Sequence, residues 1–182
     1  TSWRSSLPAD APNHFLINIQ PGEVDGVRAF LRERGSSSAE LFPMVRGRLT
    51  AINGRAVGPD GYDNPRAKRL VEREFNLSWT DRLQEDNRIL SGRWWNPEDR
   101  GQGVASVEVG LAKDLGIALN DTLRFQIAGQ ALEAKVTSLR SVEWDSFRAN
   151  FFVVFPSGVL DAYPATWITS FHLPAGQKPL LA

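Results

Sequence analysis

The chain of 182 residues has no cysteine and only two histidines, so the side chains most used in metal sites and nucleophilic catalysis are nearly absent. Without cysteine there is no disulfide, no thiolate metal ligand and no thiol nucleophile. The two histidines, His14 and His172, do not belong to an H-x-x-x-H motif or a carboxylate-flanked pair, which are the usual signatures of a zinc site. We therefore expect no metal centre.

Net charge and long apolar runs are also lacking. Twenty-one basic residues balance twenty-one acidic ones, so there is no overall positive field of the kind that attracts nucleic acid or anionic lipid. No run approaches the roughly 20 apolar residues of a membrane-spanning helix, and the first residues lack the basic start and apolar middle of a signal peptide. A chain that begins without Met and ends on LPAGQKPLLA looks cut at both ends, which leaves open that it was excised from a larger protein.

The sequence contains only partial matches to a dinucleotide-binding motif and to a calcium-binding loop. Gly101-Gln-Gly103 starts a dinucleotide-binding pattern, but Ser106 stands where its third glycine belongs and no apolar strand precedes it. Acidic and amide residues cluster in PDGYDN, yet their spacing is wrong for an EF-hand and suits a solvated turn. These are Asp60, Asp63 and Asn64. We expect no bound cofactor.

Candidates for catalysis and nucleic-acid binding have equally simple structural explanations. No G-x-S-x-G elbow is present. Glu143 and Asp145 flank Trp144, but on a strand both carboxylates would share one solvated face. The basic cluster of Arg66, Lys68, Arg69 and Arg73 is interrupted by Glu72 and Glu74, as on an ordinary charged surface. We expect no catalytic residue and no nucleic-acid partner.

What the chain does contain is six tryptophans, two of them adjacent. In a strand, Trp94 and Trp95 would point to opposite faces, so one ring could pack in the core while the other is exposed. Core packing or an interface between lobes explains such a pair. An exposed ring would instead suit contact with an apolar ligand or a protein, so Trp94 and Trp95 are the candidate contact residues.

Apolar periodicity predicts a strand, a helix and a second strand after a lead-in. The first strand is Phe15–Ile19, and a helix then starts at Pro21 and stops at Gly35. The second strand, 41–52, alternates, with one face formed by Val45, Gly47, Leu49 and Ala51. Asn53-Gly54 predicts a type I′ turn after it.

The remaining segments predict further strands and one capped helix. Ser106 would cap this helix and Gly116 would end it. The expected strands are 75–79, 88–95, 122–128, a return strand from Leu132 after a turn at Gly129-Gln130, 150–155 and 166–173. This order predicts an α+β fold of two small lobes.

Long segments of the chain, taken in order, resemble the extracytoplasmic domain of FtsX-like, or MacB-type, ABC transporter permeases, in particular the YbbP-like branch. The resemblance extends from about Leu7 to Pro174. The segments are LPADAPNHFLINIQPGEVDGVRAFL, LFPMVRGRLTAING, EFNLSWTDRLQEDNRILSGRWW, SVEVGLAKDLGIALNDTLRFQIAGQALEAKVTSLRSVEWDSFRANFFVVFPSGVL and ATWITSFHLP.

The resemblance implies a MacB-like periplasmic core domain, held between two transmembrane helices that lie outside this chain. A porter-like β-α-β lobe would carry an inserted, smaller α/β lobe. Residues 1–12 would lead in from one transmembrane helix, and 175–182 would form a tail toward the other. Residues 13–54 and 148–174 would form the porter-like lobe, and 55–147 the insertion.

The implied function is that of a non-catalytic periplasmic domain in a bacterial inner-membrane permease, serving export or handling of lipid or envelope components. A separate cytoplasmic ATP-binding subunit would hydrolyse ATP, and the periplasmic domain would move in response. An envelope protein or a lipid-like substrate would be its other partner. Two alternatives stay open: a free-standing module that binds an apolar ligand or protein through Trp94 and Trp95, and a hydrolase with an unrecognised site.

Overall fold

The computed structural model describes residues 11–36 and 39–173, and its chain falls into two compact units. The first, which we call the βαβ unit, comprises Thr1–Pro43, Glu143–Asn150 and Thr166–Ala182; the second, the barrel unit, comprises Met44–Val142 and Phe151–Ala165. Helices and strands occur together, so the expectation of a mixed fold is confirmed. The unit limits differ from those of the lobes expected above, and the porter-like and inserted roles of those lobes stay predictions.

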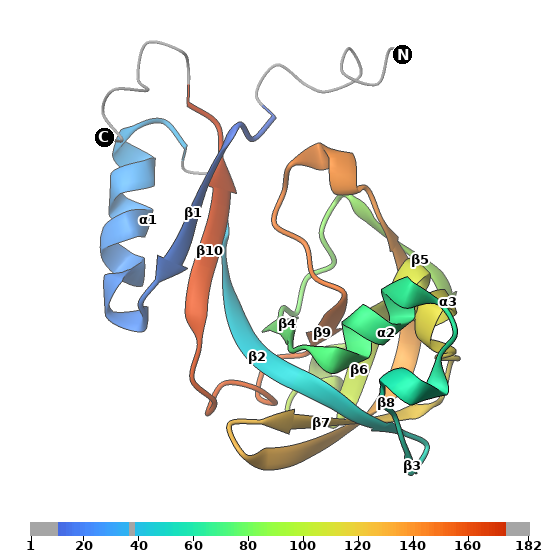
Figure 1. The fold of residues 1–182 in the computed structure, drawn as a ribbon. Coiled ribbons are helices and arrows are strands. Elements are labelled where there is room, and N and C mark those ends of the chain that lie inside the picture. Colours follow the sequence, from blue (N-terminus) through green and yellow to red (C-terminus); the bar gives the residue numbers. More distant parts are fainter. Residues whose placement is uncertain (1–10, 37–38, 174–182) are drawn as a thin grey trace, which may run out of the picture. The chain divides into compact units, whose positions relative to one another are not determined.

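The βαβ unit contains a helix against a pair of antiparallel strands (Figure 1). Strand β1, His14–Ile19, pairs with β10, Thr166–Phe171, with His14 opposite Phe171. A 3₁₀ turn, Pro21–Glu23, leads into α1, Val24–Glu33. The helix buries Val24 and Leu31 in a core shared with Ile19, Leu41, Phe171 and Leu173. The strand and the stop at Gly35 were predicted correctly. Pro21 begins the 3₁₀ turn, and the α-helix itself begins three residues later than predicted, at Val24.

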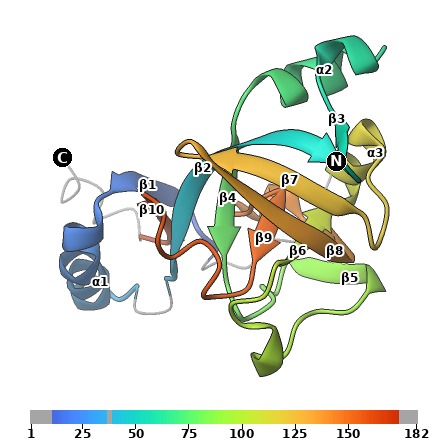
Figure 2. The same cartoon turned by 90° about the horizontal axis from the view of Figure 1, so that it is seen from below.

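Six strands of the barrel unit close into a ring (Figure 2). Strand β2 is Leu41–Ile52, of which the part from Met44 belongs to this unit. Around the ring it is followed by β4 (Phe75–Trp79), β9 (Val153–Phe155), β6 (Val104–Glu108), β8 (Gln130–Val142) and β7 (Thr122–Ile127), which pairs with β2 again. The β4–β9 and β6–β8 pairs are parallel and the others antiparallel. Closure removes the exposed edges that an open sheet would have.

Alternate residues of the ring form the core of the barrel unit. Opposite partners such as Val45 and Leu77, and Leu49 and Phe125, are all at most 2% exposed. Two helices, α2 (Pro65–Glu72) and α3 (Val109–Leu115), add their apolar faces to the same core. Two further strands lie outside the ring: β3 (Arg55–Ala56) pairs with β2, and β5 (Asn87–Gly92) pairs with β8.

The predicted cap at Ser106 is wrong. Ser106 and Val107 lie in β6 and are fully buried, because this segment pairs with β8 on one side and β9 on the other. The helix begins later, and the Glu108 carboxylate caps it by accepting the Leu111 N–H at 2.8 Å. Gly116 ends α3 with φ of 74°, as predicted. Pairing on both sides of the strand outweighed the local helical pattern.

Smaller corrections concern turns and strand ends. The turn between β7 and β8 is formed by Ala128 and Gly129, with φ of 50° and 80°, one residue earlier than predicted. A bulge between Leu49 and Ala51 turns Ile52 into the core in place of Ala51. Three strands are shorter at one end than expected: β5 ends at Gly92, β9 begins at Val153 and β10 ends at Phe171.

Other predictions held. The Asn53-Gly54 turn has φ of 53° and 79°, as a type I′ turn requires. The predicted lead-in before residue 11 and the tail after residue 173 lie outside the described residues. Within the described part of the chain, no helix is both long enough and apolar enough to span a membrane.

Candidate functional site: three loops around Asp81 and the tryptophan pair

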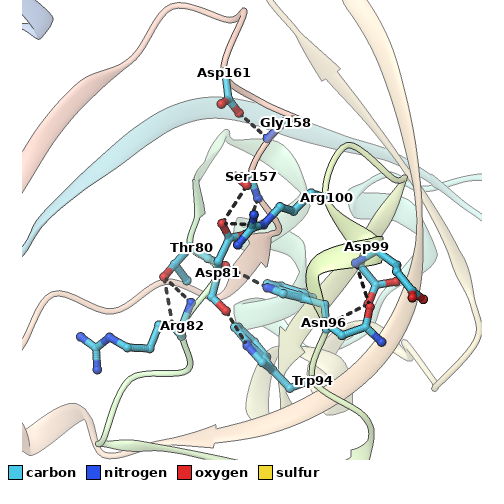
Figure 3. A network of polar contacts seen from close by, with 12 residues as sticks. Thr80, Asp81, Arg82, Trp94, Asn96, Asp99, Arg100, Ser157, Gly158 and Asp161 are labelled. Carbon is cyan, nitrogen blue, oxygen red and sulfur yellow. Dashed lines mark hydrogen bonds and ion pairs between the residues drawn. The ribbon is translucent and has the colours of Figure 1, made fainter.

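Three loops of the barrel unit converge because their strands end or begin at the same side of the sheet. Strands β4 and β9 are parallel, with Trp79 opposite Phe155, so the segments that follow them leave together. Strand β6 is antiparallel to β9, so the segment that precedes β6 arrives at this side. The loops are 80–86, 93–103 and 156–161. Figure 3 shows the polar contacts among them.

Asp81 connects all three loops. Its carboxylate accepts hydrogen bonds from the Ser157 N–H at 2.9 Å and the Ser157 hydroxyl at 2.8 Å, and it lies 3.4 Å from Arg100 Nε (Figure 3). The Gly101 N–H also donates to the Ser157 carbonyl at 2.8 Å. Charged acceptors strengthen hydrogen bonds of this kind. The cluster is thus held together by contacts within the protein.

The tryptophan pair lies in the second of these loops and not in a strand. Positive φ at Gly92, 77°, ends β5 before Trp94 is reached. The two rings stack on each other, with centroids 3.9 Å apart and planes at 29°. Their indole N–H groups donate to neighbouring carbonyls, Trp94 to Asp81 at 3.0 Å and Trp95 to Thr80 at 2.9 Å. The expectation that the rings point to opposite faces is therefore wrong.

The two indole rings nonetheless differ in their solvent exposure. Trp95 is 6% exposed and contributes to the interior, whereas Trp94 is partly exposed. Their common role in this structure is to fix the second loop to the first through the indole hydrogen bonds. Contact of Trp94 or Trp95 with an apolar ligand or a protein stays a prediction.

An ion pair stiffens the same loop. Arg93 donates to both carboxylate oxygens of Asp99, at 2.8 and 3.1 Å. Asp99 also accepts the Asn96 N–H at 2.9 Å, and Asn96 in turn caps the 3₁₀ turn Pro97–Asp99. The hydrogen bond from Arg93, followed by that from Asn96, lowers the pKa of the Asp99 carboxyl below its ordinary value. Asp99 is therefore charged at neutral pH, with its donors arranged around it.

The other candidates from the sequence are not brought together. His14 bonds to the Asn13 side chain and His172 to the Ala11 carbonyl, both within the βαβ unit. Glu143 and Asp145 are exposed beside or within the 3₁₀ turn Trp144–Ser146, and Asn64 caps α2. Among residues 11–36 and 39–173, no three His, Cys, Asp or Glu side chains are placed to hold a metal ion.

Sequence reasoning missed Asp81, Ser157 and the buried Arg140. An aspartate two residues after the end of a predicted strand is an ordinary turn residue, and nothing in its neighbours points to Ser157, 76 positions away. The hydrogen bonds and the ion pair around Asp81 limit the chemistry that this cluster can perform. The contacts found here join loops, and they contain no histidine or cysteine to activate a nucleophile.

Comparison with known proteins relates nearly the whole chain to one segment of an ABC transporter permease, with 41% identity over 178 residues and 98% of the chain covered. That relative is the uncharacterized ABC transporter permease YbbP of Escherichia coli (strain K12), and the chain spans only 21% of its length. The resemblance to YbbP-like ABC transporter permeases is thus confirmed. The chain is a permease-related domain. No family model matches it.

A solved structure gives a weaker likeness. It is a domain of a protein assigned as a permease, from Porphyromonas gingivalis, and it aligns with 96% of this chain and 73% of its own. The TM-score is 0.42 and the sequences are 9% identical. A likeness of this degree supports no conclusion about the fold or function of the present chain.

Proposed function

We propose that this chain is a non-catalytic, periplasmic domain of the permease subunit of an ABC transporter. In this role it couples ATP hydrolysis by a cytoplasmic ATP-binding subunit to a conformational change in the periplasm, in a transporter for export or for lipid or envelope components. The observation that carries the proposal is the 41% identity to an ABC transporter permease across 98% of the chain.

Two structural features support a mechanical role. The polar cluster around Asp81 is occupied with joining loops, so its groups are held by the protein itself. The chain also passes between the two compact units four times, at 43/44, 142/143, 150/151 and 165/166. Units within one chain commonly move relative to each other unless a large apolar interface holds them. Movement between two such units is the conformational change that we propose.

The proposal is tested by measuring distances between the units in a working transporter. In a chimeric permease, the chain replaces the matching 178-residue segment of the E. coli relative. The chimera is combined with the ATP-binding subunit of that relative and placed in lipid nanodiscs. Since the chain has no cysteine, exposed residues of α1 and α2 can carry spin labels through Asp25→Cys and Arg69→Cys. We expect the distance distribution to shift between the nucleotide-free and vanadate-trapped states.

A second label pair supplies the control. Arg69→Cys and Gln126→Cys both lie in the barrel unit, so their distance should stay the same in both states. Identical distributions for the pair between the units, in a transporter that hydrolyses ATP, would overturn the proposed coupling.

A further inference from the structure

Arg140 is a charged side chain in the interior of the barrel unit. It is 1% exposed and is among the largest fully buried side chains of the described residues. It lies on β8 two residues before Val142, the last residue before the chain leaves the barrel unit. The chain then runs through Glu143–Asn150, which belongs to the βαβ unit, and returns at Phe151. We call Glu143–Asn150 the excursion.

The guanidinium of Arg140 joins the exit of the excursion to its return. Arg140 Nη2 donates to the Phe151 carbonyl at 2.6 Å and to the Phe152 carbonyl at 3.3 Å. These residues come before the first residue of β9. Arg140 Nη1 donates to the Asn87 side chain at the start of β5, at 3.0 Å. One side chain therefore fixes three separate segments of the barrel unit.

The Phe152 carbonyl receives a second hydrogen bond at this point, from the Glu108 N–H at 2.8 Å. Glu108 is opposite Arg140 in the β6–β8 pair, and its carboxylate caps α3. The return of the chain is thus tied to β8 through Arg140 and to the junction of β6 and α3 through Glu108. Both ties act within one or two residues of the unit boundary.

Burying the charge of Arg140 costs free energy of folding. Burial lowers the pKa of Arg140 to about 10, while the nearby charges of Glu108 and Asp86 act in the opposite direction. The side chain stays charged at neutral pH, and its Nε has no hydrogen-bond partner. A buried ion is a weak source of stability, because desolvation opposes the attraction between charges. An apolar side chain would fill this space, but it could not hold Phe151 and Phe152.

We propose that Arg140 is a positioning residue that fixes both ends of the excursion to the barrel unit, so that displacement of the excursion is passed to β8 and β9. Without this tie the displacement would be absorbed as fraying of the chain around residues 141–152. The second half of this inference rests on the proposed function, since it requires the two units to move.

The fixing is tested by hydrogen exchange of the 182-residue chain. Arg140→Met fills similar volume but removes all three hydrogen bonds. We expect its amides at 143–153 to exchange about tenfold faster relative to those of β7. The matched control is Leu49→Ala, which leaves a cavity between β2 and β7 and should speed exchange throughout the barrel unit. A uniform change in Arg140→Met, like that of the control, would overturn the inference.

If Arg140→Met does not fold, Arg140→Lys takes its place. Lysine keeps the charge but has a compact ammonium group in place of the planar fork, so it cannot reproduce all three hydrogen bonds. We expect the same local increase in exchange, smaller in size. An unchanged exchange rate at 143–153 would show that a positive charge alone is enough to fix this segment. That result would overturn the role given to the guanidinium hydrogen bonds.

The transmission is tested in the chimeric transporter with labels at Asp25 and Arg69. We expect Arg140→Met to lose at least half of the shift caused by vanadate trapping, while Leu49→Ala keeps it. If the unmodified chimera shows no shift, the proposed function fails. If the chimera and Arg140→Met shift equally, the role of Arg140 fails while the proposed function stands.

Discussion

Gly92 occupies a position where the space, and not the dihedral angle alone, requires glycine. Its φ is 77°, and an added Cβ atom would overlap the Thr137 carbonyl oxygen and approach Leu119 Cδ1 to 2.7 Å. Gly116 has a similar φ of 74°, but nothing lies within 4 Å of the place its Cβ would occupy. Comparing alanine substitutions at the two glycines therefore distinguishes the free-energy cost of a steric clash from that of a positive φ.

Gly92→Ala is expected to lower the free energy of unfolding by about 3 kcal/mol or more, because backbone strain and overlap add together. Gly116→Ala should cost only about 1 kcal/mol, since strain alone applies. Urea denaturation of the two variants measures both values. Equal losses would show that β5 shifts away from β8 without cost, contrary to the contact described.

At the scale of residues, the sequence singles out the two adjacent tryptophans but does not predict how their rings are arranged. Trp94 and Trp95 stand out by composition, yet their stacking depends on Gly92, which ends the strand two residues earlier. Arg140 gives no signal at all. Its three acceptors lie on Asn87, Phe151 and Phe152, and only the folded register brings these residues to it.

At the scale of elements, the second loop of the Asp81 cluster should respond to acid. The pKa of Asp99 is lowered from its ordinary 3.8 mainly by its hydrogen bond with Arg93. The folded state therefore favours the charged carboxylate, and this stabilisation is complete above pH 3.8 and lost as pH falls through the lower folded value. Asp99→Asn removes the charge that responds.

We expect Asp99→Asn to lower the melting temperature by about 3 °C at pH 6. The difference from the unmodified chain should shrink steadily as pH falls below 3.8, which thermal melts between pH 6 and pH 2 would measure. Asp60→Asn, at an exposed aspartate in the 3₁₀ turn Pro59–Gly61, is the matched control. A constant difference at all pH values would mean that the Asp99 charge is not involved.

Most single elements follow from sequence patterns, but their partners do not. Alternation predicted β2 and β7, the predicted proline begins the 3₁₀ turn that leads into α1, and the predicted glycine follows the end of α1. Strand β6 was missed because its buried residues are continuous and fit a helix as well as a strand. The ring itself depends on the parallel β4–β9 and β6–β8 pairs, which join segments distant along the chain. No local pattern reports such pairing.

At the scale of the whole molecule, the proposed function fixes the side of the membrane on which this chain lies. In the chimeric permease, a cysteine introduced at Asp25 should react with a membrane-impermeant maleimide in intact cells with a permeabilised outer membrane. A cysteine in the ATP-binding subunit should react only after lysis. Reaction of both cysteines only after lysis, observed by gel shift, would place the chain in the cytoplasm and contradict the proposal.

The limits of the observed units differ from those of the expected lobes, and the lobes stay a prediction. The resemblance assigned all of 13–54 to one lobe, whereas the part of β2 after Pro43 pairs with β4 and β7 of the ring. One long strand thus belongs to both units. A boundary inside a strand cannot be inferred from composition, because linkers are recognised by proline, glycine and polar residues.

The position of β9 in the ring also determines when the barrel unit can close during synthesis. Three residues, Val153–Phe155, close the gap between β4 and β6, and they come after all the other ring strands in the chain. Until these residues have been made, β4 and β6 each keep one strand edge without its partner. Contacts between residues so far apart in sequence also slow folding. Until β9 is in place the barrel cannot cover these edges, and unpaired strand edges are prone to aggregation.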